Sequence, residues 1–356
     1  ESYFGDVFYL PWSQIHLDVI AKLERTVEKG EIFALAMPRG SGKTTLCQIA
    51  ILWAILTGRR SFAVLIAATA SRAADLLEDV KVWLETSEPL FEDFPEVCCP
   101  IRKLERIASR ARGQKHHGEP TRIGWKAGEL VLPTIEGSAS SGACIAVAGM
   151  SGSDIRGLSH TRADGKKIRP NLVLIDDPQT RESAQSLTQC ATLEKIIKSD
   201  VLGMAGPGKR LACCVTMTAV AVDDVAERLL DRRKNPEFRG ERYRLMNALP
   251  ESPLWEEYRK IREAELINDG SGEQATAFYA KRRAEMDAGA LPTWEARYNS
   301  DEISAVQHAM NLKFRDEASF LSEYQNQPIN EEEERGTFDG EQLTAATSGR
   351  PRGFIP

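Results

Sequence analysis

The chain has 356 residues, of which 42% are hydrophobic and 28% are charged, and its formal net charge is −6 at pH 7. These proportions are those of an ordinary globular protein, and the length suffices for one large core or two smaller ones. No apolar run approaches the roughly 18–20 residues that cross a bilayer, which argues against a membrane protein. The net acidity does not by itself indicate a nucleic-acid binder.

The seven cysteines include two adjacent pairs and no CxxC motif. Adjacent cysteines make poor disulfide partners, so all seven are expected to be reduced thiols in a cytosolic protein. Cys98 and Cys99, together with His116 and His117, form a group that suggests zinc. Zinc ligands usually come as spaced pairs, however, and we expect no metal at this group.

The first quarter of the chain alternates between helical and strand patterns. We expect helices over 12–29, 44–57 and 70–86 and buried strands over 32–37 and 62–68. Alternation at this spacing predicts a parallel sheet with helices on both of its faces.

The rest of the chain changes character twice. Residues 95–125 are polar, basic and turn-rich, and residues 128–150 suggest short strands. Further strands are expected over 172–175 and 210–216, and helices over 183–203, 223–233 and parts of 251–325. These patterns divide the chain into an α/β core (1–247), a helical subdomain packed on it (248–330) and a linker (331–356).

Residues 101–126 hold eight Lys or Arg and two acids. Such a stretch can contact DNA phosphates, and a solvated helix face explains it equally well.

The strongest motif follows the strand over 32–37 and opens the next helix. Its nucleotide-binding candidates are Pro38, Gly40, Ser41, Gly42, Lys43, Thr44 and Thr45. Glycines let backbone N–H groups curl around phosphate oxygens, and the helix N-terminus adds its positive dipole end. Lys43 would reach the β- and γ-phosphates, and Thr44 would ligate Mg²⁺. The sequence therefore predicts a Mg²⁺-dependent P-loop ATPase, although Met37 stands where the first Gly of the motif is usual.

An acidic residue at the end of a second strand should complete this site. Asp176, which follows the strand over 172–175, is expected to hold Mg²⁺ through water. Many ATPases have Glu next, as the base for the attacking water, but this chain has Asp177. Either Asp177 or Glu182 could take that role, and Asp177 could instead be a helix N-cap.

Four further residues are candidates for contacts with the nucleotide. Trp12 and Gln14 stand at the start of the first helix, and the Gln14 amide could read the adenine edge. Arg39 and Arg156 could each neutralise charge on the γ-phosphate as an arginine finger. Ordinary salt bridges would explain either arginine equally well.

Several of these segments, in this order, resemble the ATPase region of the large terminase subunit of tailed double-stranded DNA bacteriophages. The segments that carry the resemblance are 9–14, 38–44, 67–73, 155–157, 169–178, 215–229 and 320–328. The arginine after the strand, at Arg39, is similar to the deviant Walker A motif of that family. Residues 155–157, followed by 169–178, are the most diagnostic.

The resemblance implies a fold and roles for particular residues. The fold would be a three-layer α/β P-loop NTPase with a mostly parallel central sheet, of the class with an additional strand and a catalytic Glu. Arg156 would match an arginine inserted into a neighbouring subunit's ATP site. Thr218, or alternatively Thr216, would sense the γ-phosphate and pass its loss to the helical subdomain.

The resemblance also implies partners and a location. Family members form a ring, usually a pentamer, on the portal protein of the procapsid, work with a small terminase subunit and drive dsDNA through the ring. The expected location is the host bacterial cytoplasm. The ribonuclease-H-like nuclease of the family would begin with a strand and an Asp, and no such pattern occurs before Pro356. We therefore expect no nuclease activity in this chain.

Two other classes of function also fit the sequence. One is a helicase-like nucleic-acid translocase, because its ATP site would look alike. The other is a hydrolysis-silent, nucleotide-dependent DNA-binding or assembly protein, because Glu is missing after Asp176.

Overall fold

The computed structural model describes residues 3–5, 7–206 and 208–329. Its centre is an eight-stranded sheet with the order β12-β1-β11-β10-β2-β7-β6-β5. The strands are β1 (Ile32–Ala36), β2 (Phe62–Ala67), β5 (Gly124–Lys126), β6 (Glu129–Val131), β7 (Cys144–Gly149), β10 (Leu172–Asp176), β11 (Ala212–Met217) and β12 (Glu241–Arg242). The predicted α/β fold with a mostly parallel central sheet is confirmed.

Six neighbouring strands from β12 to β7 are parallel, and β6 and β5 extend the sheet in antiparallel fashion. Strand β11 lies between β1, which leads into the P-loop, and β10, which ends in Asp176. The expected additional strand between the two motif-bearing strands is therefore present. In-register pairing of the parallel strands brings all their carboxyl ends to one edge of the sheet.

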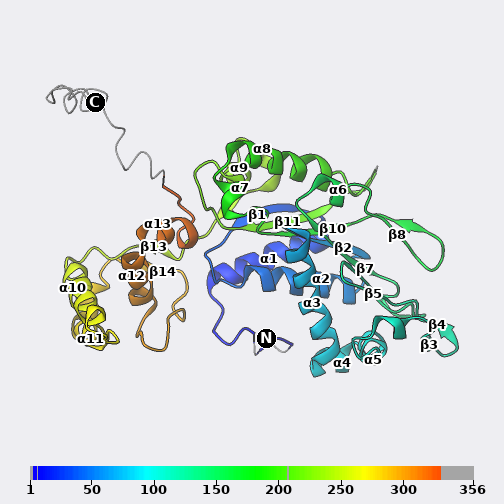
Figure 1. The fold of residues 1–356 in the computed structure, drawn as a ribbon, viewed down its shortest axis with the longest axis horizontal. Coiled ribbons are helices and arrows are strands. Elements are labelled where there is room, and N and C mark those ends of the chain that lie inside the picture. The colour runs from blue at the N-terminus through cyan, green and yellow to red at the C-terminus, as the bar shows by residue number, and fades with distance from the viewer. Residues whose placement is uncertain (1–2, 6, 207, 330–356) are drawn as a thin grey trace, which may run out of the picture.

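Helices cover both faces of the sheet, which makes the three predicted layers (Figure 1). One face packs against α1 (Gln14–Lys29), α2 (Lys43–Leu56) and α3 (Ala70–Thr86). The opposite face packs against α8 (Leu187–Lys195), the π-helical turn η2 (Ile196–Val201) and α9 (Val225–Leu230). Strands that are buried on both faces read as continuous apolar runs, as β2 does.

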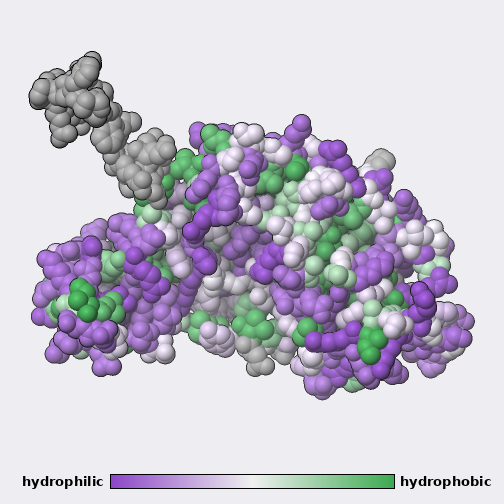
Figure 2. Space-filling model, in the orientation of Figure 1, coloured by the Kyte–Doolittle hydropathy of each residue, from purple (hydrophilic) through white to green (hydrophobic). Residues whose placement is uncertain are grey.

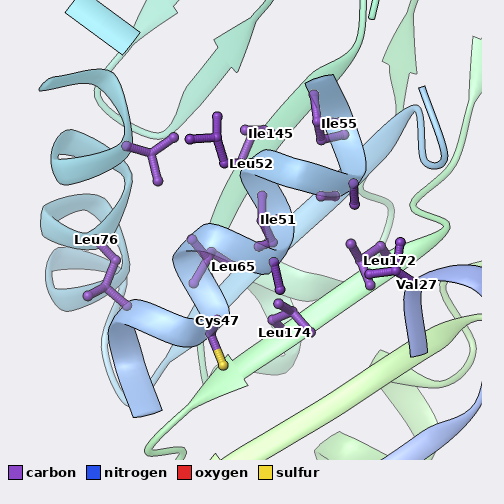
Figure 3. Close-up of a cluster of buried hydrophobic side chains, with 14 of the residues drawn as sticks. Val27, Cys47, Ile51, Leu52, Ile55, Leu65, Leu76, Ile145, Leu172 and Leu174 are labelled. Atoms are coloured by element: carbon purple, nitrogen blue, oxygen red, sulfur yellow. The ribbon is translucent and has the colours of Figure 1, made fainter. Parts of the chain in front are cut away.

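The interior of the first face is built around α2, which is apolar on nearly its whole circumference. Its side chains Ile51, Leu52 and Ile55 pack on Leu65 of β2 and on neighbouring strands, as Figure 3 shows. A helix enclosed by α1, α3 and the sheet has no fully exposed residue, so its sequence shows little amphipathic periodicity. This packing fixes the helix whose first turn carries the P-loop lysine.

Two predicted segments differ from the structure. The stretch over 95–125 is not only turns: it contains α5 (Pro95–Arg102), which follows α4 (Glu88–Asp93), and then η1 (Ala108–Ala111), β3 (Lys115–His116) and β4 (Glu119–Pro120). The single helix expected over 183–203 is divided into α7 (Arg181–Ala184), α8 and η2, because the Ser186 side chain caps α8 and starts a new helix there. The remaining short elements are α6 (Gly152–Ile155), β8 (His160–Thr161), β9 (Lys167–Ile168) and η3 (Pro236–Phe238).

The last part of the described chain forms a mainly helical lobe beside the sheet (Figure 1). It contains β13 (Met246–Ala248), α10 (Leu254–Ile267), α11 (Glu273–Met286), β14 (Leu291–Pro292), α12 (Ala305–Arg315), α13 (Glu317–Ser319) and η4 (Phe320–Tyr324). A separate apolar cluster around Trp255, Tyr258 and Tyr279 fills its interior, and its surface in Figure 2 is mainly hydrophilic. The domain boundaries stay a prediction, and the linker over 331–356 lies outside the described residues. No helix in the described part of the chain could span a membrane.

The sheet interior should respond strongly to a loss of volume. Leu65 is fully buried between α2 and α3, so Leu65→Ala should lower the free energy of unfolding by about 2–5 kcal/mol through lost transfer energy and a residual cavity. Leu187→Ala is the matched control, because Leu187 is 59% exposed and should change stability by less than about 0.5 kcal/mol. Urea unfolding followed by circular dichroism measures both; equal effects would contradict the packing.

Candidate nucleotide-binding site

The P-loop connects β1 to α2 and depends on two glycines in the left-handed region. Gly40 has φ 73° and Gly42 has φ 75°, a conformation that side-chain-bearing residues rarely adopt. Gly42 is also the N-cap of α2, and its carbonyl accepts a hydrogen bond from the N–H of Leu46. The loop therefore presents backbone N–H groups and the positive end of α2 at one place, as an anion site requires.

Lys43, the first residue of α2, is buried at the centre of the site. Its Nζ lies 2.9 Å from Asp177 Oδ2 and donates a hydrogen bond of 3.1 Å to Thr218 Oγ1. These contacts link three segments, since Asp177 follows β10 and Thr218 follows β11. A bound phosphate would compete with the Asp177 carboxylate for the ammonium group of Lys43.

Asp176 ends β10 and is only 4% exposed. The Thr44 hydroxyl donates to Asp176 Oδ2 at 2.7 Å, and the Thr216 hydroxyl donates to its Oδ1 at 3.2 Å. Burial and the neighbouring charge of Asp177 raise the pKa of Asp176 above its ordinary value. Because burial disfavours the ionised carboxylate, a cation bound beside Asp176 would stabilise its charged form.

The two candidate bases are placed differently. Asp177 has φ 44°, which is uncommon outside glycine, and its N–H donates to Thr216 O at 2.9 Å, which holds the turn. The side chain, 44% exposed, pairs with Lys43. Glu182 lies exposed in the first turn of α7. Hydrogen bonds with the Thr180 side chain and its own backbone N–H lower the pKa of Glu182. The structure brings Asp177 to the P-loop, whereas no hydrogen bond or ion pair joins Glu182 to it within the described residues.

The residue after Thr218 is hydrogen-bonded to the helical lobe. This residue, Ala219, donates its N–H to Asn326 Oδ1 at 3.0 Å, and Asn326 Nδ2 donates to Tyr243 O at 2.8 Å. Asn326 is fully buried, so this link cannot be exchanged for water without cost. Thr216 instead faces Asp176 and Cys47. Of the two threonines, Thr218 is therefore the one that contacts the lysine.

Arg39 does not point at Lys43 and is held by the lobe. Its Nη1 lies 2.5 Å from Glu323 Oε2, and the other Glu323 oxygen accepts from Arg181 at 2.6 Å. Arg297 of the lobe donates to the backbone carbonyl of Arg39. The alternative of an ordinary salt bridge thus describes Arg39 in this structure.

Arg156 follows α6, and its side chain is 73% exposed and 2.9 Å from Asp200. The segment leaves the sheet from β7, which is four strands away from β1. At about 4.8 Å per strand, these strands are separated by about 19 Å. Arg156 is therefore exposed, with Asp200 as its partner, and its own P-loop is a distant target.

A cavity of about 490 Å³ adjoins the P-loop and is large enough for a small ligand. Its lining includes Trp12, His16 and Trp294, together with Gly40, Ser41, Gly42 and Thr45 of the loop. Gln14 is exposed and does not belong to this lining. Pro38 is buried at the end of β1. The predicted adenine contact of Gln14 stays a prediction, while Trp12 is in place for stacking.

His16 was not among the site residues predicted from the sequence, yet it supports the P-loop. The Ser13 N–H donates to His16 Nδ1 at 3.2 Å, so Nδ1 is an acceptor and the proton is on Nε2. Nε2 lies 3.1 Å from Ser41 O and donates to it. Burial lowers the pKa of His16, which favours this neutral form. The Trp294 ring packs edge-on against it at 4.4 Å between centroids, and Trp294 Nε1 donates to Pro11 O.

The oxygen groups beside the lysine fit a magnesium ion. Thr44 supplies a hydroxyl and Asp176 a carboxylate, and both are the hard ligands that Mg²⁺ prefers. Their hydrogen bond shows that the two oxygens reach one another. The raised pKa of Asp176 gives a physical reason for a cation there.

Comparisons with known proteins give similarity among solved structures alone. No family model matches the chain, and no curated protein matches it. Among solved structures, the chain is similar to a mutant of the large terminase ATPase domain of Thermus phage P74-26. The identity is 14%, the TM-score is 0.41, and the match covers 92% of this chain and 99% of that one. A similarity of this extent does not establish a shared function.

The buried carboxylate should make stability depend on pH. Because the pKa of Asp176 is raised on folding, the unfolding free energy of the wild type falls as pH rises from the unfolded pKa, about 3.9, through the folded one. Asp176→Asn has no proton to lose, so without Mg²⁺ and nucleotide it should melt higher than the wild type near pH 7. The difference should shrink toward about pH 4.

Thermal unfolding at several pH values measures this effect. Asp18→Asn on the exposed side of α1 is the matched control and should show no such pH-dependent gain. A variant Asp176→Asn that is less stable than the wild type at neutral pH would contradict the electrostatic account.

Proposed function

We propose that this chain is the ATPase domain of a viral genome-packaging motor, the terminase large subunit. It hydrolyses ATP to translocate dsDNA into a procapsid. The observation that carries the ATPase part is the contact of Lys43 with Asp177 and Thr218, beside the hydrogen-bonded pair of Thr44 and Asp176. The packaging part rests on the ordered segments that resemble the terminase family.

The reaction is an in-line attack of water on the γ-phosphate, with ADP as the leaving group. Lys43 neutralises charge that develops on the phosphate oxygens, and the P-loop N–H groups orient the triphosphate. Thr44 would hold Mg²⁺ directly and Asp176 through water, and the ion would supply positive charge beside the phosphates. Asp177, released from Lys43 by the incoming phosphate, orients the water and accepts its proton; Glu182 is the alternative base.

The base of the nucleotide occupies the cavity beside the P-loop. Trp12 offers an aromatic face there, and Trp294 and Arg297 bring residues of the helical lobe to the same cavity. Nucleotide binding thus contacts both parts of the chain. Loss of the γ-phosphate changes the partner of Lys43, which contacts Thr218, and the hydrogen bond from the adjacent Ala219 N–H to Asn326 carries that change to the lobe.

The working form is a homo-oligomeric ring, a pentamer on the portal protein, which cooperates with a small terminase subunit. The exposure of Arg156 and its separation from β1 support its action in a neighbouring subunit's site. A helicase-like translocase is the runner-up. A hydrolysis-silent assembly protein is the third candidate, favoured by the absence of Glu after Asp176.

Lys43→Ala should lower the ATP turnover number by about 100-fold or more, because the group that neutralises the γ-phosphate is removed. The measurement is phosphate release at high protein concentration, with and without dsDNA. Lys281→Ala, an exposed lysine of α11, is the matched control and should leave turnover unchanged. If Lys43→Ala and the wild type release phosphate equally under every assembly condition, the proposal of a packaging motor is refuted.

A mixing experiment tests whether Arg156 acts in trans. Arg156→Ala alone should lower turnover by about 10³-fold or more, the effect of losing an arginine finger. Mixing it with Lys43→Ala should restore part of the activity, because an intact P-loop then faces an intact Arg156. A Lys43→Ala/Arg156→Ala partner supplies neither group and should restore nothing. Equal recovery with both partners, or full activity of Arg156→Ala alone, would contradict the assignment.

A further inference from the structure

A second cluster of ligand-type side chains lies at the edge of the sheet opposite the P-loop. Glu129 of β6, Cys144 of β7 and His160 of β8 each bring one ligand atom within 4.8 Å of the others. Cys144 is the first residue of β7 and pairs with Phe62, the first residue of β2. The cluster is therefore at the amino ends of the parallel strands, a strand length from the phosphate site.

The distances within the cluster suit one small metal ion. His160 Nδ1 lies 3.5 Å from Glu129 Oε1, and Cys144 Sγ lies 3.8 Å from the same oxygen. Ligand atoms about 2.0–2.3 Å from a tetrahedral zinc ion are about 3.3–3.7 Å apart. The 3.5 Å edge already has this length and the 3.8 Å edge is just beyond it, so a small side-chain adjustment would complete the set.

The surroundings also suit a metal ligand set. Glu129 Oε2 pairs with Lys126 at 2.7 Å, which fixes the carboxylate and leaves Oε1 facing the thiol and the imidazole. Such support of a ligand by a second group is usual around protein metals. Cys144 is fully buried and His160 is 15% exposed, with its ring beside Phe62. The site is thus largely shielded from solvent, and its remaining exposure is at His160 of the β8–β9 hairpin.

We propose that Glu129, Cys144 and His160 bind a zinc-type divalent ion that clamps the β8–β9 hairpin to the end of the sheet. Three protein ligands of mixed S, N and O type leave a fourth position for water. On binding, the Cys144 thiol loses its proton to solvent and the sulfur bonds to the metal as a thiolate. The hairpin falls in the long insert between Arg156 and β10 and projects from the body of the molecule (Figure 1). A metal would strengthen the attachment of this small element, which hydrogen bonds from Arg162 to Ser141 O and from Arg122 to Ala163 O already join to the body. This site does not depend on the proposed ATPase activity.

Titration of the whole chain with Co²⁺ in excess Mg²⁺ tests the site, because Mg²⁺ competes at the phosphate site but not for a thiolate. We expect a thiolate-to-cobalt charge-transfer band that saturates near one equivalent, with release of a proton. Cys144→Ser should abolish the band, and His160→Gln should weaken Co²⁺ binding at least about tenfold. Cys99→Ser and His116→Gln, in α5 and β3, are the matched controls and should keep it.

A second readout does not depend on the buried cysteine. Zn²⁺ should raise the melting temperature of the wild type and slow hydrogen exchange in the β8–β9 hairpin. His160→Gln changes only a hairpin side chain and should lose both effects while folding normally. Absence of the charge-transfer band in the wild type, its persistence in Cys144→Ser, or a Zn²⁺ effect that is equal in His160→Gln would each overturn the proposal.

Discussion

The site depends on the register of three parallel strands, β1, β11 and β10. Thr216 pairs with Leu35 on one side and with Asp176 on the other, so all three strands end at the same level. Because β11 separates β1 from β10, the P-loop and Asp176 are about 10 Å apart at the sheet. The side chains of Lys43 and Thr44, which open α2, cross this gap. A shift of one residue in β10 or β11 would turn Asp176 or Thr216 to the other face.

This arrangement gathers charge in a place where charge is unfavourable. Asp176 is buried beside Asp177, and two threonine hydroxyls and one ammonium group offset only part of that cost, as the raised pKa of Asp176 shows. Asp177 adds a left-handed backbone conformation. Local strain and repulsion of this kind are common where a ligand supplies the missing stabilisation. Nucleotide and cation would therefore stabilise the fold as well as occupy the site.

The sequence was sufficient for the parts of the site that are local. The strand, the glycine loop and α2 are contiguous, and Asp176 follows its strand directly, so pattern alone places them. His16, Trp294 and Arg297 could not be found in this way, because they reach the P-loop across 25 residues or more. One signal for His16 was available in the sequence, because residues two apart lie on opposite sides of a helix. His16 belongs to the buried stripe of α1 with Val19 and Leu23, and Gln14 therefore faces outward.

The cluster of Glu129, Cys144 and His160 likewise could not be predicted from the sequence pattern. Its three residues are 15 and 16 positions apart, and only the antiparallel pairing of β6 with β7 and the folding back of the hairpin unite them. Adjacent cysteines and histidines looked more suggestive in the sequence, yet α5 buries Cys98 and leaves Cys99 only half-buried. The cluster also bears on Arg156, which precedes His160 by four residues. Four extended residues span at most about 14 Å, so an anchor at His160 restricts how far Arg156 can move. A metal ion bound at His160 would thereby reduce the number of conformations open to Arg156. Less conformational entropy would then be lost when Arg156 docks at a neighbouring subunit's phosphate.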